Sequence, residues 1–176
     1  EKYVDVIYSD SGRLTNKDIN VEFRAFSDLA IITSPTVAEE VYEPYEYSFT
    51  NNGDWPVSIR VLSGTDAGQI RAVIGSVYNI DRVPPEAEVY VNTVELTNQN
   101  VTVTLLACDD KGKVITIKNN GGKSEYVFEE NGIFTFDFTD EAGNVGHKTV
   151  TVSNIDKSIP SAKIRYFADE SKGNRI

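Results

Sequence analysis

The sequence predicts an all-β protein in which one small two-sheet sandwich occurs twice. Apolar and polar residues alternate in several short segments, and turns rich in Gly, Asn and Asp separate these segments. An unusual phrase also recurs, because "NID" followed by proline stands at both Asn79 and Asn154, 75 positions apart. Period-two alternation is typical of half-buried strands, and it favours antiparallel sheets with one face in water. We find no stretch with convincing helical periodicity.

The recurring phrase belongs to a longer internal repeat. The matched segments, in chain order, are 14–23 with 96–105, 46–53 with 125–132, 66–69 with 141–144, and 79–89 with 154–164. The spacing between partners falls from 82 to 79 to 75 residues, so the first copy carries about seven extra residues, around 35–46 and 62–69. Matches that keep their order while insertions fall in loop-like places indicate a duplicated domain.

The repeat divides the chain into three parts. We expect a first domain over 1–83, a second over 84–158, and the start of a third repeat or a disordered tail over 159–176. "SAKIRYF" would be the first strand of that third unit. A lone strand cannot fold by itself, so residues 161–176 are expected to lack sheet partners of their own.

The strands of each copy place aromatic residues on one face. In "IFTFDF" the three phenylalanines share a face, and Thr135 and Asp137 lie on the other. The remaining alternation gives the candidate core, which is Tyr47, Phe49, Trp55, Val57 and Ile59 in the first copy and Tyr126, Phe128, Phe134, Phe136 and Phe138 in the second. The single cysteine, Cys108, continues the alternation of "VTVTLLAC" and is expected to be a buried thiol.

The stretch "NGIFTFDFTDEAGNVGHKTVTVSNIDKSIP" resembles the last hairpin of bacterial immunoglobulin-like (BIg-type) repeats. Such repeats occur in tandem in surface and secreted proteins, especially of Gram-positive bacteria. The second copy matches from about 87 to 156, whereas the first departs in the longer hairpin "TDAGQIRAVIGS". The resemblance implies two tandem immunoglobulin-like β-sandwiches and an extracellular or cell-surface location.

The resemblance also implies a role, because members of the family are mostly spacers, stalks or accessory modules. We therefore expect a non-enzymatic module of a longer chain, which extends and orients its neighbouring domains. The net charge of −10 and the scattered lysines and arginines argue against nucleic acid as a partner. No apolar run approaches the roughly 20 residues that span a bilayer.

Enzymatic activity is the weakest of the functions considered. Asp137, Asp140 and Glu141 are the candidates for a catalytic carboxylate pair, but the pattern puts them on a wet strand face and in a tight hairpin. A glycosidase needs two carboxyls across a cleft, one of them with a raised pKa. The lone His147 and the lone Cys108 make no plausible catalytic or zinc set.

Binding of a glycan, or of a host or cell-wall protein, is the alternative function. Aromatic residues gather around the first copy's insertion, and aromatic faces stack on sugars. Trp55 matches a core position, so Tyr42 and Tyr45 are the residues left for a glycan platform. The competing interpretation is local packing of a long loop.

A calcium site at the junction is the remaining candidate. In an immunoglobulin-like sandwich, the loops after the second strand and between the last two strands lie where the chain enters. The residues brought there would be Asp81, Asp109, Asp110, Asp140, Glu141 and Asn144. Hard oxygen ligands suit calcium, and some bacterial immunoglobulin-like arrays are stiffened by calcium between domains. The alternative is that Asp140–Asn144 is only a hairpin turn and that Asp81 only hydrogen-bonds its own linker. Pro84 and Pro85 would then stiffen the linker without metal.

Overall fold

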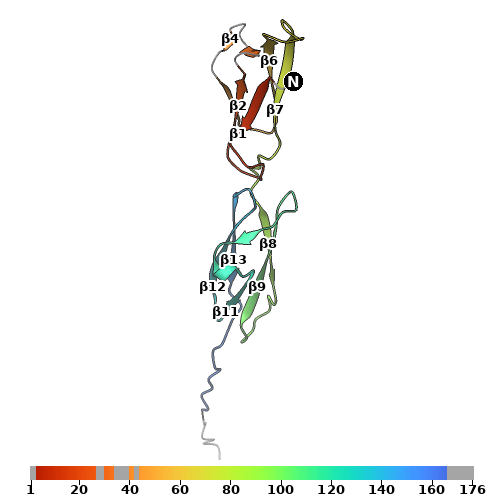
Figure 1. Ribbon diagram of the computed structural model, residues 1–176. Coiled ribbons are helices and arrows are strands. Elements are labelled where there is room, and N and C mark those ends of the chain that lie inside the picture. The colour runs from red at the N-terminus through yellow and green to blue at the C-terminus, as the bar shows by residue number, and fades with distance from the viewer. Residues whose placement is uncertain (1–2, 27–29, 34–39, 42–43, 166–176) are drawn as a thin grey trace, which may run out of the picture.

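The computed structural model describes residues 3–26, 30–33, 40–41 and 44–165. Two β-sandwiches follow one another end to end, and the chain leaves the second sandwich at the end far from the first (Figure 1). Each sandwich has its own cluster of buried apolar side chains. The architecture is therefore all-β with immunoglobulin-like sandwiches, as the sequence predicts.

The first sandwich contains two antiparallel sheets. One sheet has the order β1 (Val4–Tyr8), β2 (Ile19–Ala25), β5 (Tyr45–Phe49). The other has the order β4 (Glu40–Val41), β3 (Ala30–Thr33), β6 (Gly53–Val61), β7 (Ile70–Val77). The strand β4 comes from the first insertion, so that insertion lengthens a sheet by one edge strand instead of remaining only a loop.

The second sandwich repeats this plan with shorter connections. Its sheets have the orders β8 (Glu86–Val91), β9 (Val101–Cys108), β11 (Glu125–Phe128) and β10 (Thr116–Ile117), β12 (Gly132–Thr139), β13 (Val145–Val152). A single 3-10 turn, Asn120–Gly122, is the only helical element among the described residues. No helix in that part of the chain is long and apolar enough to cross a membrane.

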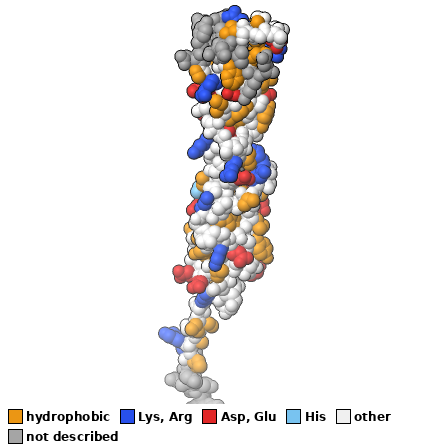
Figure 2. Space-filling view, viewed as in Figure 1, with side chains coloured by type: hydrophobic (Ala, Val, Ile, Leu, Met, Phe, Trp, Pro, Cys, Tyr) orange, Lys and Arg blue, Asp and Glu red, His pale blue; other side chains and the backbone are white. Residues whose placement is uncertain are grey.

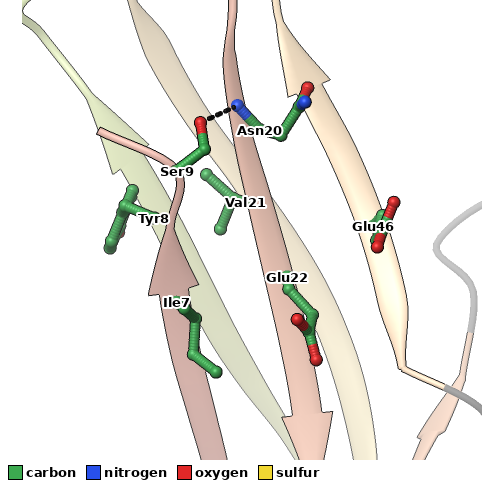
Figure 3. Close-up of a pocket in the computed structure, with 7 residues that line it drawn as sticks. All are labelled: Ile7, Tyr8, Ser9, Asn20, Val21, Glu22 and Glu46. Atoms are coloured by element: carbon green, nitrogen blue, oxygen red, sulfur yellow. Dashed lines mark hydrogen bonds between the residues drawn. The ribbon is translucent and has the colours of Figure 1, made fainter.

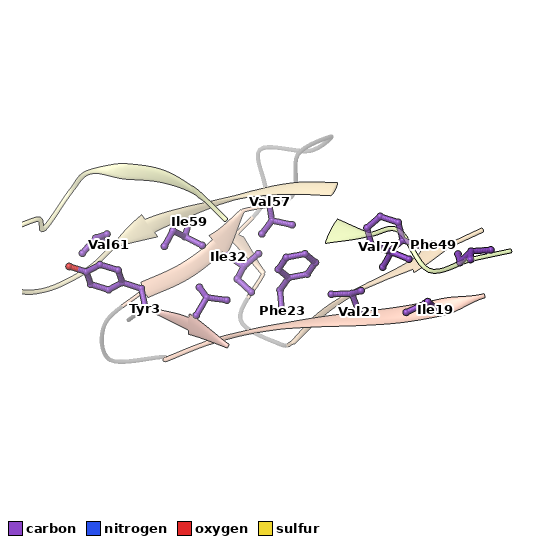
Figure 4. Close-up of a cluster of buried hydrophobic side chains, with 12 residues drawn as sticks. Tyr3, Ile19, Val21, Phe23, Ile32, Phe49, Val57, Ile59, Val61 and Val77 are labelled. Atoms are coloured by element: carbon purple, nitrogen blue, oxygen red, sulfur yellow. The ribbon is translucent and has the colours of Figure 1, made fainter. Parts of the chain in front are cut away.

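The aromatic pattern places equivalent residues in the two cores. Tyr47 stacks on Trp55 with ring centroids 3.8 Å apart, and Tyr126 stacks on Phe134 at the same distance. In the first core, the side chains of Phe23, Ile32 and Val57 lie between the two sheets (Figure 4). All ten residues that the alternation assigns to the cores belong to these two clusters, so that part of the prediction is confirmed.

Cys108 does not follow the prediction, because its thiol is exposed. Strand β9 buries Val101, Val103 and Leu105 on its inner face, and Leu106 and Cys108 fall on the outer face. Alternation from Val101 already places Cys108 on the outer face, so the prediction of a buried thiol followed the apolar character of "LLAC" and not the register of the strand. A shift of one residue moves every following side chain to the other face.

Gly146 fixes how the linker meets the second core. A Cβ at this position would lie 2.8 Å from Phe138 Cζ and 2.8 Å from the carbonyl oxygen of Pro85. Only glycine lets β13 pass between the buried ring and the entering backbone. Beyond the second sandwich, residues 161–165 form no strand and are exposed, and residues 166–176 lie outside the described part.

Candidate functional site at the domain junction

The phrase "NID" turns the chain from one sandwich into the next. Ile80 is buried and forms a parallel bridge with Thr15. The side chain of Asn52 donates to the Ile80 carbonyl and accepts from its N–H, both at 2.8 Å. The N–H of Asp81 donates to the carbonyl of Thr15 at 2.8 Å. The first sandwich therefore fixes the backbone up to Asp81.

The second sandwich holds the same linker through Asn144. The side-chain amide of Asn144 donates to the carbonyls of Asp81 at 3.0 Å and Val83 at 3.2 Å. Asp140 orients this amide, because its two carboxylate oxygens accept from the backbone N–H and the side chain of Asn144, each at 2.8 Å. One further bond joins the domains directly, from the N–H of Asn16 to the carbonyl of Ala142 at 3.2 Å.

Three carboxylates gather beside this linker. One oxygen each from Asp81, Asp109 and Asp110 lies within 4.8 Å of the others. Asp81 and Asp109 are buried, with 2 % and 7 % of their surface exposed. One oxygen of Asp109, Oδ1, is buried without a hydrogen-bond partner among the described residues. An unpaired buried carboxylate oxygen costs free energy, so it is a natural ligand position for a cation.

Lys111 already supplies one positive charge to this group. Its Nζ lies 2.7 Å from Asp81 Oδ2. Burial favours the neutral form of Asp81, but the Lys111 ammonium and the N–H of Val83 outweigh this effect and bring its pKa below the usual value. For Asp110, partial desolvation and then the charge of Asp81 raise the pKa.

The cluster is smaller than the predicted ligand set. Asp81, Asp109 and Asp110 meet as proposed, and their oxygens are the hard ligands that calcium prefers. Asp140 is close by, but both of its oxygens serve Asn144, and Glu141 is exposed in the turn. Sequence reasoning missed Lys111, although "DDK" places a cation directly after two acids, and it treated Asn144 as an oxygen ligand although its amide acts as a donor.

The predicted glycan residues are only partly described. Tyr42 lies outside the described residues. Tyr45 is half-buried in β5, where its ring packs on Phe23 with centroids 6.1 Å apart and an interplanar angle of 49°. The glycan platform therefore stays a prediction.

Two of the three candidate catalytic acids, Asp137 and Asp140, have hydrogen-bond partners, and Glu141 is exposed in the turn. Asp137 contacts Nδ1 of His147 at 2.6 Å with one oxygen and accepts from Asn119 with the other at 3.1 Å. A shallow hollow on the outer face of the β1-β2-β5 sheet holds Glu22 and Glu46 (Figure 3), but Glu22 pairs with Arg24 at 2.6 Å. The contacts of Asp137 and Glu22 are those of surface residues.

The comparisons with known proteins add little. No family model matches the chain, and no curated protein does. Among solved structures, the chain is similar to the full ectodomain (Ig1–Ig3) of mouse nectin-like molecule 4, with 9 % identity and a TM-score of 0.33. The match covers 93 % of this chain and 67 % of that one. The fold described above rests on the strands and cores themselves.

Proposed function

We propose that the chain is a non-enzymatic spacer of a larger bacterial surface or secreted protein, made of two tandem immunoglobulin-like domains, 1–83 and 84–158. Its role is to extend and orient the neighbouring domains of the same polypeptide outside the cell. The observation that carries this proposal is the hydrogen-bonded junction, in which the Asn144 amide donates to the carbonyls of Asp81 and Val83.

A spacer needs a junction that does not bend freely, and several contacts support this. The linker is bonded to the first domain through Thr15 and to the second through Asn144. Arg82 pairs with Asp18, and Pro84 and Pro85 restrict the next backbone angles. The two sandwiches then form one narrow column (Figure 2). The excess of acidic side chains suits an exposed surface that must stay soluble.

Calcium is the cofactor that we propose for this junction. Asp81, Asp109 and Asp110 would hold it, and the orphaned Oδ1 of Asp109 would gain a partner. The ion would add positive charge to a group of three carboxylates in which Lys111 forms an ion pair with Asp81. Its contribution would be to tie the linker residue Asp81 to the loop after β9, which belongs to the second domain.

The test is a comparison of domain motion in three forms of the 176-residue chain. Small-angle scattering and ¹⁵N relaxation are measured on the wild type, on Asn144→Ala, and on Gln69→Ala. Gln69 is the matched control, because it occupies the equivalent turn position of the first domain and is exposed there. We expect one shared tumbling time in the wild type and the control, and separate times in Asn144→Ala. Independent tumbling of the two domains in the wild type would refute the spacer function.

A further inference from the structure

We propose that the far end of the second domain is a preformed docking surface for a third domain in the same polypeptide, one built like the second domain. The docking surface is defined here as the loop 93–98 together with the exit segment 154–158. The proposal rests on the spacer function, and it names the partner that the spacer would hold. It derives from a comparison of the two ends of the two sandwiches.

The exit of the second domain repeats five hydrogen bonds of the first domain's exit. At each end an Asn side chain brackets an Ile, the chain forms a parallel bridge with a Thr, and an Asp accepts from the N–H two residues later. At the first end the bonded pairs are Asn52–Ile80, Thr15–Asn79, Asp81–Thr15 and Val83–Asp81. At the second end the corresponding pairs, in the same order, are Asn131–Ile155, Thr97–Asn154, Asp156–Thr97 and Ser158–Asp156. The bond lengths agree within 0.2 Å, since they run from 2.8 to 3.1 Å at the first end and from 2.8 to 2.9 Å at the second.

The first end is covered, and the second is not. At the first, the carbonyls of Asp81 and Val83 accept from Asn144, and the N–H of Asn16 donates to Ala142. The counterparts at the second end are the carbonyls of Asp156 and Ser158 and the N–H of Asn98. All three residues are exposed, and within the described part of the chain none of these three groups has a hydrogen-bond partner.

The side chain of Asp156 also offers an exposed negative charge to an incoming domain. Its counterpart Asp81 is buried and pairs with Lys111 at 2.7 Å. Asp156 is exposed, and hydrogen bonds from Ser158 lower its pKa, so it is an anion at neutral pH. An incoming domain with a lysine in the loop after its second strand would neutralise this charge as Lys111 does for Asp81.

The geometry also selects the kind of domain. An Asn side chain that donates to two carbonyls must be held in the right direction. At the first junction Asp140, four residues before Asn144, orients the Asn144 amide. The corresponding turn of the first domain has Thr65 and Gln69 in these two places. Its Asp66 is held within the domain by Arg71 at 2.5 Å. A second copy of this chain, arriving with its first domain, therefore cannot rebuild the junction, whereas a further domain of the second type can.

The experiment inserts one more second domain into the full chain. A copy of residues 84–158 is placed between Ser158 and Ile159, which restores the spacing of the first junction. Amide exchange at Asn98 is then compared with the 176-residue chain, and Asn16, already bonded to Ala142, serves as the internal reference. We expect exchange at Asn98 to slow at least about tenfold, because its N–H gains a carbonyl partner.

Two variants test the mechanism. Replacing the Asn copied from position 144 by Ala should return exchange at Asn98 to its rate in the unextended chain, while the same change at the Asn copied from position 98 should not. An insert of residues 1–83, which carries the Thr65 and Gln69 turn, should leave Asn98 unprotected. Equal protection by both kinds of insert would overturn the proposed selectivity.

The remaining outcomes are also decisive. Unchanged exchange at Asn98, or an inserted copy that fails to fold behind Ser158, would overturn the docking surface. If Asn16 also exchanges freely and the first two domains tumble separately, the spacer function itself has failed. Protection at Asn16 with free exchange at Asn98 would remove the docking surface alone.

Discussion

Replacing Phe136 by Ala should strongly destabilise the second domain while leaving the first domain intact. Phe136 lies in the middle of β12 and is fully buried, with 0 % of its surface exposed. Its ring meets Phe134 edge-on, with centroids 4.9 Å apart and an interplanar angle of 82°. The substitution therefore removes the centre of the aromatic row and leaves a cavity between the two sheets.

The size of the effect follows from the burial. Truncation of a buried Phe to Ala costs about 3–5 kcal/mol, including the cavity left behind. In a domain of this size each kcal/mol lowers Tm by about 4–8 °C, so the expected fall is at least about 12 °C. A domain of roughly 75 residues has a total free energy of unfolding of about 4–11 kcal/mol. The substitution should therefore remove at least about a quarter of the domain's stability.

The chain allows the two domains to be observed separately. Its single tryptophan, Trp55, stacks on Tyr47 in the first domain, so tryptophan fluorescence follows that domain alone. Methyl NMR signals of Val101 and Val103, both fully buried, follow the second. The control is Thr135→Ala. Thr135 is half-buried and bonded through its hydroxyl to the Thr149 hydroxyl at 2.8 Å, so its loss should cost less than about 1.5 kcal/mol.

Two results would refute this reasoning. If Thr135→Ala lowered Tm of the second domain more than Phe136→Ala, the inward face of β12 would be the other one. If the Trp55 transition moved as far as the second-domain transition, the two cores would not be energetically separate.

Two further predictions concern the junction. The pKa of Asp81 is lower in the folded chain than its unfolded value of about 3.9, so its pairing with Lys111 contributes stability above that pH and loses it as the pH falls further. The stability advantage of wild type over Asp81→Asn, measured by urea unfolding, should therefore shrink between pH 6 and about pH 3; an advantage that does not depend on pH would contradict the ion pair. Millimolar calcium should raise Tm of the second domain relative to chelator, because an ion that binds only the folded state stabilises it. Asp109→Asn should abolish this rise. Identical melts of the wild type with calcium and with chelator would mean that Lys111 is the only cation at the three carboxylates.

The cores could be predicted from the sequence because their pattern is periodic. Alternation alone identifies Phe136 and Phe138 as inward-facing, and the repeat pairs Tyr47 with Tyr126. The prediction failed at Cys108 because the apolar run "LLAC" was taken as buried throughout, although alternation from Val101 places Cys108 on the outer face. Edge strand β4 was missed because a pair of only two residues gives no periodic signal.

The position of the acidic cluster at the junction could be predicted from the sequence, but the role of each side chain in it could not. The repeated phrase and the loop positions bring Asp81, Asp109 and Asp110 together. The roles of Asn144 and Lys111 depend on side-chain direction over a few ångströms, which spacing does not encode. Asp140 is the instructive case, since a carboxylate in an acidic loop suggests a metal ligand, yet here it orients an amide.

The parallel bridge between Thr97 and Ile155 has a mechanical consequence. The chain enters the second sandwich at one end and leaves it at the other (Figure 1), so a pull on the two termini acts along the strands. The bonds between Thr97 and its neighbours Asn154 and Asp156 then run across the direction of pulling and are strained together, in shear. A hairpin pulled apart from its open end loses its bonds in succession. The repeated "NID" phrase thus gives the exit of each domain a pair of bonds loaded in shear, at the point where tension along the chain would otherwise start to peel off the last strand.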